Sequence, residues 1–117
     1  MTFDFEQFPV YKLALSFTKS IDECIQRSDI PKSSRLADQL IRASLSIPLN
    51  IAEGAGRYHK PDKKNFYIIA RGSVFECVAI LDILKGKEGF APQICLEYYK
   101  TLEDLSKMLS GLINSQK

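Results

Sequence analysis

The sequence predicts an all-α fold, an antiparallel up-down-up-down four-helix bundle that forms a single domain over residues 1–117. Three observations lead to this prediction. Apolar residues recur at steps of three and four along four segments, Pro and Gly separate these segments, and no stretch alternates as a strand would. Each segment has about 20 residues, or roughly 30 Å of helix. Because the connections are short, consecutive helices are expected to pack antiparallel.

The first two helices are expected over residues 9–27 and 35–56. Pro9 suits a first helical turn, where its missing N–H would have no partner. Before the second helix, Ser33 or Ser34 can act as the N-cap, because its side-chain oxygen accepts from a free backbone N–H. The inward positions of these helices are Val10, Ala14, Phe17, Ile21, Cys24, Leu36, Leu40, Ala43 and Ile47.

The other two helices are expected over residues 62–85 and 92–114. Pro61 precedes the third, Gly86 and Gly89 follow it, and Pro92 starts the fourth. The inward positions are Phe66, Ala70, Ser73, Cys77, Ile80 and Leu84 in the third helix, and Ile94, Tyr98, Leu102, Leu105, Leu109 and Leu112 in the fourth.

The third helix is apolar nearly all round. In a four-helix bundle each helix needs only one buried apolar stripe. The additional apolar residues of the third helix are therefore buried either because this helix is central in its own bundle or because it contacts a partner. We favour self-association through this helix. The surplus residues are Tyr67, Ile68, Ile69, Val74, Phe75, Val78 and Ile83.

Composition narrows the class of protein. The chain is 45% hydrophobic with a net charge of +2, which excludes disorder. Its longest uncharged run, residues 43–52, is about half of a membrane span, and we expect no signal peptide because Asp4 and Glu6 interrupt the first apolar residues. Cys24, Cys77 and Cys95 are odd in number and widely spaced, so we expect reduced cysteines in a cytoplasmic protein. Metal, nucleotide and hydrolase motifs such as HExxH, GxxxxGK[ST] and GxSxG are missing, so we expect no metal, no cofactor and no catalytic residues.

A polar stripe runs along the second helix. Its members recur at steps of three and four and therefore share one face. A turn near residue 60 would place Ser73 and Glu76 of the third helix level with Ser46 and Arg42. We predict a partly buried polar layer that sets helix register, with a ligand or catalytic cleft using Glu53 and Arg42 as the alternative. The layer comprises Arg42, Ser46, Asn50, Glu53, Arg71, Ser73 and Glu76.

Three further residues break the regularity of the second helix. Pro48 removes the backbone bond to the Ser44 carbonyl and is expected to bend the helix. Gly54 and Gly56 either end the helix or let another backbone approach closely.

Charge is concentrated at one turn. Residues 35–73 carry seven basic and three acidic side chains, a balance of +4, whereas the rest of the chain sums to −2. Cations next to a Tyr can bind phosphates and stack on an unpaired base. The alternative is an ordinary solvated loop, in which His59 is simply exposed. The candidate nucleic-acid contacts are Arg57, Tyr58, Lys60, Lys63 and Lys64.

Two segments carry a family resemblance. Residues 39–57 read QxxRAxxSIxxNIAEGxGR and residues 66–76 read FxxxARGSxxE. The chain resembles the four-helix bundle proteins encoded in intervening sequences of bacterial large-subunit ribosomal RNA genes. This resemblance implies a cytoplasmic homopentamer with no established enzymatic activity. The family is similar in fold to the basic accessory protein of diversity-generating retroelements, which binds nucleic acid and a reverse transcriptase, but a charge of +2 departs from that relative.

Three functions compete on these grounds. The first is a non-enzymatic oligomeric bundle that binds RNA or a ribonucleoprotein through the basic loop. The second is a protein-interaction module that uses the third helix and Tyr98–Tyr99. The third, an enzyme, is disfavoured because Ser46 and Ser73 lack a nearby base, since His59 lies too far along the chain.

Overall fold

The computed structural model describes residues 3–28, 34–87 and 89–117. Across these ranges it contains no strand, and the all-α prediction is confirmed. The elements are the 3-10 helix η1 (Asp4–Gln7) and the α-helices α1 (Pro9–Arg27), α2 (Arg35–Ala55), α3 (Lys60–Leu84) and α4 (Pro92–Asn114). Predicted and observed helix bounds agree except that α2 and α3 each end one residue early and α3 begins two residues early. That early start places Pro61 inside the first helical turn, where a missing N–H costs nothing.

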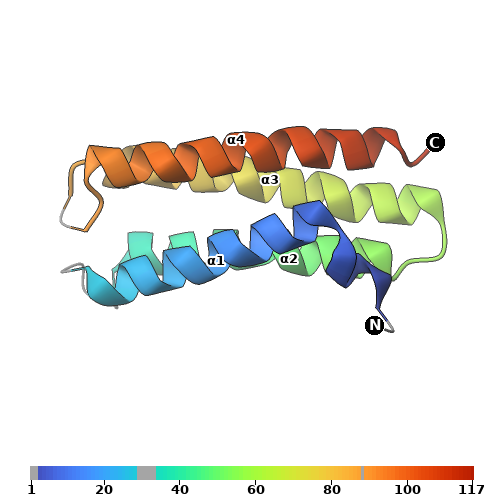
Figure 1. Cartoon of the computed structure of the whole chain (residues 1–117), viewed down its shortest axis with the longest axis horizontal. Coiled ribbons are helices and arrows are strands. Elements are labelled where there is room, and N and C mark those ends of the chain that lie inside the picture. Colours follow the sequence, from blue (N-terminus) through green and yellow to red (C-terminus); the bar gives the residue numbers. More distant parts are fainter. Residues whose placement is uncertain (1–2, 29–33, 88) are drawn as a thin grey trace.

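Successive helices run in opposite directions (Figure 1). One layer holds α1 and α2, and the other holds α3 and α4; each helix contacts the next, and α1 also contacts α4. The 3-10 helix η1, the α2–α3 turn and the C-terminal end of α4 lie at one end of the bundle, with the α3–α4 loop at the other. The bundle measures 44 × 24 × 21 Å.

Buried apolar side chains from all four helices form one core. Most predicted inward positions belong to it, but Cys24 is only half-buried because Ile25, a step of four from Ile21, takes the inward place. Ile94 is exposed rather than inward: it lies in the first turn of α4. The α3–α4 loop contributes the fully buried Phe90, which periodicity did not predict. Four further predicted core positions, Leu36, Phe66, Tyr98 and Leu112, are half-buried.

The surplus apolar residues of α3 divide into two groups. Tyr67 and Val74 are buried and Val78 is half-buried, so part of the surplus belongs to the bundle itself. The remainder is exposed, which excludes a fully sunken α3. The exposed members are Ile68, Ile69, Phe75 and Ile83.

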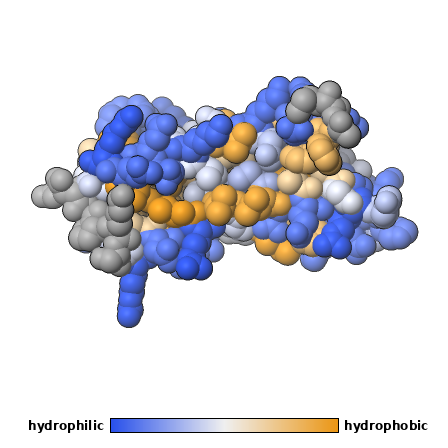
Figure 2. Space-filling model, turned by 90° about the horizontal axis from the view of Figure 1, so that it is seen from below, coloured by the Kyte–Doolittle hydropathy of each residue, from blue (hydrophilic) through white to orange (hydrophobic). Residues whose placement is uncertain are grey.

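Apolar surface also occurs on the other layer. On α2, Leu45 and Leu49 are exposed. Figure 2 views the molecule from the α1–α2 side and shows an apolar stripe along the long axis with hydrophilic borders.

Local chemistry explains the ends of α2. Ser34 is its N-cap, and the Ser34 side chain accepts from the Ala37 N–H, whereas the alternative cap, Ser33, lies outside the described residues. Gly56 is the C-cap, and its N–H donates to the carbonyls of Ala52 and Glu53. Gly54, in contrast, lies inside the helix and is buried.

Candidate functional site

The α2–α3 turn holds the predicted basic loop. Tyr58 is 96% exposed at its tip, and His59, the N-cap of α3, is also exposed and makes no side-chain cap. The turn is short because α2 ends at Gly56 and α3 begins at Lys60. The two helix ends therefore hold Tyr58 between them.

Two of the four cations are anchored locally. The Arg57 guanidinium lies over the Phe66 ring at 4.5 Å and 3.8 Å from a Glu53 carboxylate oxygen. Lys63 donates from Nζ to the Ala55 carbonyl at 2.8 Å, which neutralises the negative end of the α2 dipole. These contacts tether the turn to α2 and α3, which reduces the ordering that a ligand would have to impose.

The other two cations, Lys60 and Lys64, form no hydrogen bond or ion pair with the described residues of α2. Lys60 donates to the main-chain oxygen of Lys117 at 2.9 Å, so the end of α4 lies beside the start of α3. Lys64 is exposed, and no hydrogen bond or ion pair joins it to any part of the chain that the structure describes. The structure thus brings Arg57, Tyr58, Lys60, Lys63 and Lys64 to one end of the bundle.

The centre of the predicted polar layer is assembled. Ser73 on α3 donates to the Ser46 hydroxyl on α2 at 2.8 Å, and the Asn50 amide donates to the same hydroxyl at 2.9 Å. Ser73 is buried, whereas Ser46 and Asn50 are half-buried. This small network fixes the register of α2 against α3.

The charged members of the layer lie elsewhere. Arg42 does not reach Glu76: its Nε bonds Asp38 at 2.9 Å in an exposed i,i+4 pair, and Gln39 donates to Glu76 instead. Glu53 pairs with Arg57. These ionic groups remain in water because each finds a partner at the helix surface without being desolvated.

Arg71 turns away from α2 altogether. Its Nε donates to the Ser110 hydroxyl on α4 at 3.0 Å, and its guanidinium lies over the Phe75 ring at 4.8 Å. Arg71 was predicted to belong to the polar layer between α2 and α3, but its hydrogen bond is to α4. The i,i+4 spacing of Arg71 and Phe75 was the sequence signal for this stack.

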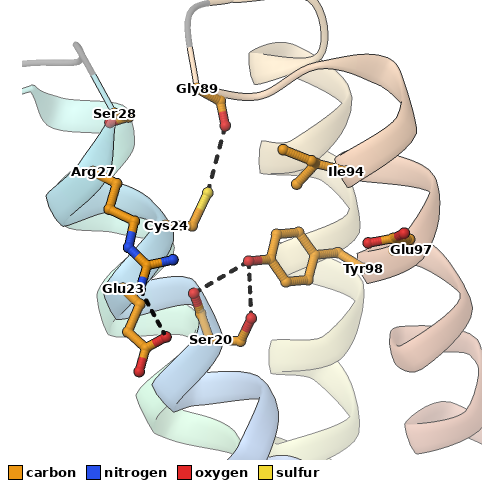
Figure 3. Close-up of a pocket in the computed structure, with 9 residues that line it drawn as sticks. All are labelled: Ser20, Glu23, Cys24, Arg27, Ser28, Gly89, Ile94, Glu97 and Tyr98. Carbon is orange, nitrogen blue, oxygen red and sulfur yellow. Dashed lines mark hydrogen bonds and ion pairs between the residues drawn. The ribbon is translucent and has the colours of Figure 1, made fainter.

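A cleft at the opposite end of the bundle separates α1 from α4 (Figure 3). Its volume is about 370 Å³. The Tyr98 hydroxyl lies 3.0 Å from the Ser20 hydroxyl and donates to the Ser20 carbonyl at 3.2 Å, while the Cys24 thiol donates to the Gly89 carbonyl at 3.5 Å. The sequence prediction missed this cleft because Cys24 and Tyr98 both fall on the inward apolar stripes.

The chemistry of this cleft does not favour catalysis. Burial raises the pKa of Tyr98 to about 12, although the Ser20 hydrogen bond opposes the rise. Outside the cleft, burial also raises the pKa of the Cys95 thiol, and it raises the pKa of Cys77 to about 12, with Glu76 adding to the latter. These groups stay protonated near pH 7 and are poor bases or nucleophiles. The histidine lies at the other bundle end, in the α2–α3 turn.

The described residues provide neither a metal site nor a membrane-spanning helix. In the three described stretches, no group of three His, Cys, Asp or Glu side chains could hold a metal ion. None of the described helices combines the length and the apolarity that crossing a membrane requires.

The fold and these sites define a small four-helix bundle whose most distinctive polar surface is a basic turn at one end. The chain belongs to the family described as 23S rRNA-intervening sequence protein, which it matches over residues 6–111. It is similar in fold to the crystal structure, at 1.70 Å, of a protein of unknown function from the S23 ribosomal protein family of Bacteroides thetaiotaomicron. The two chains are 22% identical with a TM-score of 0.80 over 89% of this chain and 97% of the other. No curated protein matches the sequence significantly.

Proposed function

We propose that the protein is a non-enzymatic, self-associating helical bundle of the cytoplasm that binds RNA, alone or in a ribonucleoprotein, through its basic turn. The observation that carries the proposal is Tyr58, 96% exposed between cations on a turn that Arg57 and Lys63 hold in place. An exposed ring can stack on an unpaired base while the lysines neutralise phosphates.

Self-association would strengthen a turn that binds weakly on its own. Each protomer carries four cations at one bundle end, so a symmetric assembly places several such turns on one particle. Linked contacts raise the overall affinity because later contacts form within the same complex. The family resemblance implies a pentamer for that assembly.

Reversing charge at the turn is expected to weaken RNA binding by at least about tenfold, because two phosphate contacts are lost and replaced by repulsion. The variant is Lys60→Glu with Lys64→Glu, and the matched control is Lys19→Glu with Lys100→Glu, which makes the same change in net charge on exposed α1 and α4 positions. Fluorescence anisotropy with a labelled single-stranded RNA at low and moderate salt measures the affinity. Equal weakening in both variants, or no binding by the natural protein at low salt, would contradict the proposal.

Exposed apolar residues on α3 favour a second, compatible candidate, a protein-interaction module. Ile69 is 44% exposed and Ile83 is 57% exposed, and a soluble monomer gains nothing from showing them. We expect light scattering to give a multiple of 13.2 kDa for the natural protein and 13.2 kDa itself for Ile69→Glu with Ile83→Glu. A natural protein that is monomeric at micromolar concentration would refute self-association. Co-purification of another protein without nucleic acid would favour the interaction module over RNA binding.

A further inference from the structure

We infer that the bound RNA is single-stranded and that it leaves the basic turn along the seam between α3 and α4, as far as the stacked pair Arg71–Phe75. The inference rests on the proposed function and extends its site to a surface that the basic-turn prediction did not include. Four features of the described residues support it: a row of cations, a stacked platform, a hollow between them, and a change of charge beyond it.

The row of cations follows one face of α3. Lys60, Lys64 and Arg71 are separated by four and seven residues, which places them on the same side of a helix with 3.6 residues per turn. That side faces α4, because Arg71 bonds Ser110 and Lys60 bonds the main chain of Lys117. The acidic residue that α3 carries before Glu76 is Asp62, which lies roughly 200° round the helix from Lys60. The row is therefore not neutralised from its own helix.

The stacked pair closes the row. Arg71 is oriented from two sides, by the Phe75 ring below its guanidinium and by Ser110 at Nε. Its two terminal nitrogens make no hydrogen bond or ion pair with any described residue, so they remain available to a phosphate. Phe75 is 55% exposed and lies about 120° round α3 from Ile69, so self-association through Ile69 can leave the Phe75 ring accessible. A guanidinium plane or an exposed ring at a fixed position is a stacking surface for an unpaired base.

A hollow of about 280 Å³ lies between the lysines and the stacked pair. Ile68 gives it an apolar wall, while Ser110 and Asn114 offer hydroxyl and amide groups to the edge of a base. Its other lining residues are Arg71 and Ile113.

The far end of the seam limits the length of the track. Beyond Phe75, the groove between the two helices is lined by two acidic residues, Asp82 and Glu103, and by one cation, Lys107, so its charge balance turns negative and disfavours phosphates. From Lys60 to Phe75 the helix rises by roughly 22 Å. The track therefore accommodates a few nucleotides, with Tyr58 at one end and Phe75 at the other.

These features favour a single strand over a duplex. The cations would bind either, but Tyr58 and the Arg71–Phe75 stack can contact base faces only when the bases are unpaired. In a duplex, those faces are covered by neighbouring base pairs.

The affinity test uses the full chain and a fluorescent oligouridine of about 12 nucleotides. We expect Arg71→Gln and Phe75→Ala each to weaken binding about five- to tenfold, since a stacked base is lost. Arg71→Lys is expected to recover part of the loss, because it restores the charge without the planar group. Arg35→Gln, an exposed arginine at the start of α2, is the matched control and should bind as the natural protein does. A duplex RNA of equal length should bind more weakly than the single strand.

The outcomes separate the two levels of the proposal. If Lys60→Glu with Lys64→Glu weakens binding while Arg71 and Phe75 variants do not, the track is overturned and the basic turn survives. If the natural protein binds no RNA, the proposed function itself fails. If the duplex binds as tightly as the single strand, the assignment of substrate class is overturned.

Cross-linking gives a readout on the unaltered protein and does not depend on how any variant folds. Ultraviolet cross-linking of the oligouridine followed by mass spectrometry should modify peptides that contain Tyr58 and peptides that contain Phe75. Cross-links confined to the Tyr58 peptide would overturn the track.

Discussion

Replacing Gly54 with alanine is expected to lower the free energy of unfolding by about 1–3 kcal/mol, although alanine is the better helix former. A Cβ at this position would lie 2.7 Å from Tyr67 Cε1 and 3.0 Å from Phe66 Cβ. Tyr67 is 2% exposed, and its ring fills the core between α2 and α3, so it cannot withdraw without displacing its neighbours. The added methyl group therefore forces the two helices apart at the end that carries the basic turn.

Gly72→Ala is the matched control. Gly72 lies inside α3, and a Cβ there would meet no atom within 4 Å. This variant should raise the free energy of unfolding by about 0.5–1 kcal/mol, because only the entropy of the unfolded chain and the helix propensity change. Urea unfolding, monitored by circular dichroism, measures the free energy of unfolding of both variants. Opposite signs for the two glycines are expected, and a Gly54→Ala protein as stable as Gly72→Ala would show that α2 and α3 are not in close contact at Gly54.

Gly54 also shows where prediction from sequence stops. The sequence left two roles for this glycine, a helix end or a close approach, because the answer depends on what stands opposite in space. The helices themselves were predictable, since Pro9, Pro61 and Pro92 start three of them and the apolar periodicity runs through each. Local rules determine these features, and local rules can be read in a sequence.

The polar layer was predicted in its neutral part and not in its charged part. Ser46 and Ser73 meet because helix pairing about the α2–α3 turn sets them level. Arg42 and Arg71 were expected to turn towards the α2–α3 seam, but a long side chain can reach several neighbours. Arg42 forms an ion pair with Asp38, one turn earlier in α2, and Arg71 donates a hydrogen bond to Ser110 on α4. The choice depends on distances that no single helix pattern contains.

The candidate RNA surface likewise has a part that the sequence predicted and a part that it did not. The cations of the turn were predicted because they are adjacent in sequence. The contribution of α4 was not, because Ser110, Asn114 and Lys117 come beside α3 only after the chain has crossed the bundle twice more. Those residues have no charge pattern of their own, and their proximity to Arg71 is a property of the fold.

Thr18→Val is expected to lower the free energy of unfolding by about 1–3 kcal/mol, because it leaves a carbonyl in the bundle without a donor. Pro48 has no N–H, so the Ser44 carbonyl loses the backbone partner it would have in an ordinary helix. The Thr18 hydroxyl on α1 lies 2.9 Å from this carbonyl oxygen and 3.0 Å from that of Ala14. Ser44 is 1% exposed, so water is a poor substitute. The Thr18 hydroxyl on α1 thus replaces the backbone N–H donor that Pro48 on α2 lacks.

A double-mutant cycle tests this compensation directly. Pro48→Ala restores a backbone N–H at position 48, which can donate to the Ser44 carbonyl in its place. Thr18→Val should therefore lower the free energy of unfolding less in the Pro48→Ala background than in the natural protein, with a coupling energy of about 0.5–2 kcal/mol. Thr18→Ser keeps the hydroxyl and is expected to retain most of the stability. If urea unfolding gives the same loss for Thr18→Val in both backgrounds, the hydroxyl acts through packing and not through the carbonyl that Pro48 leaves free.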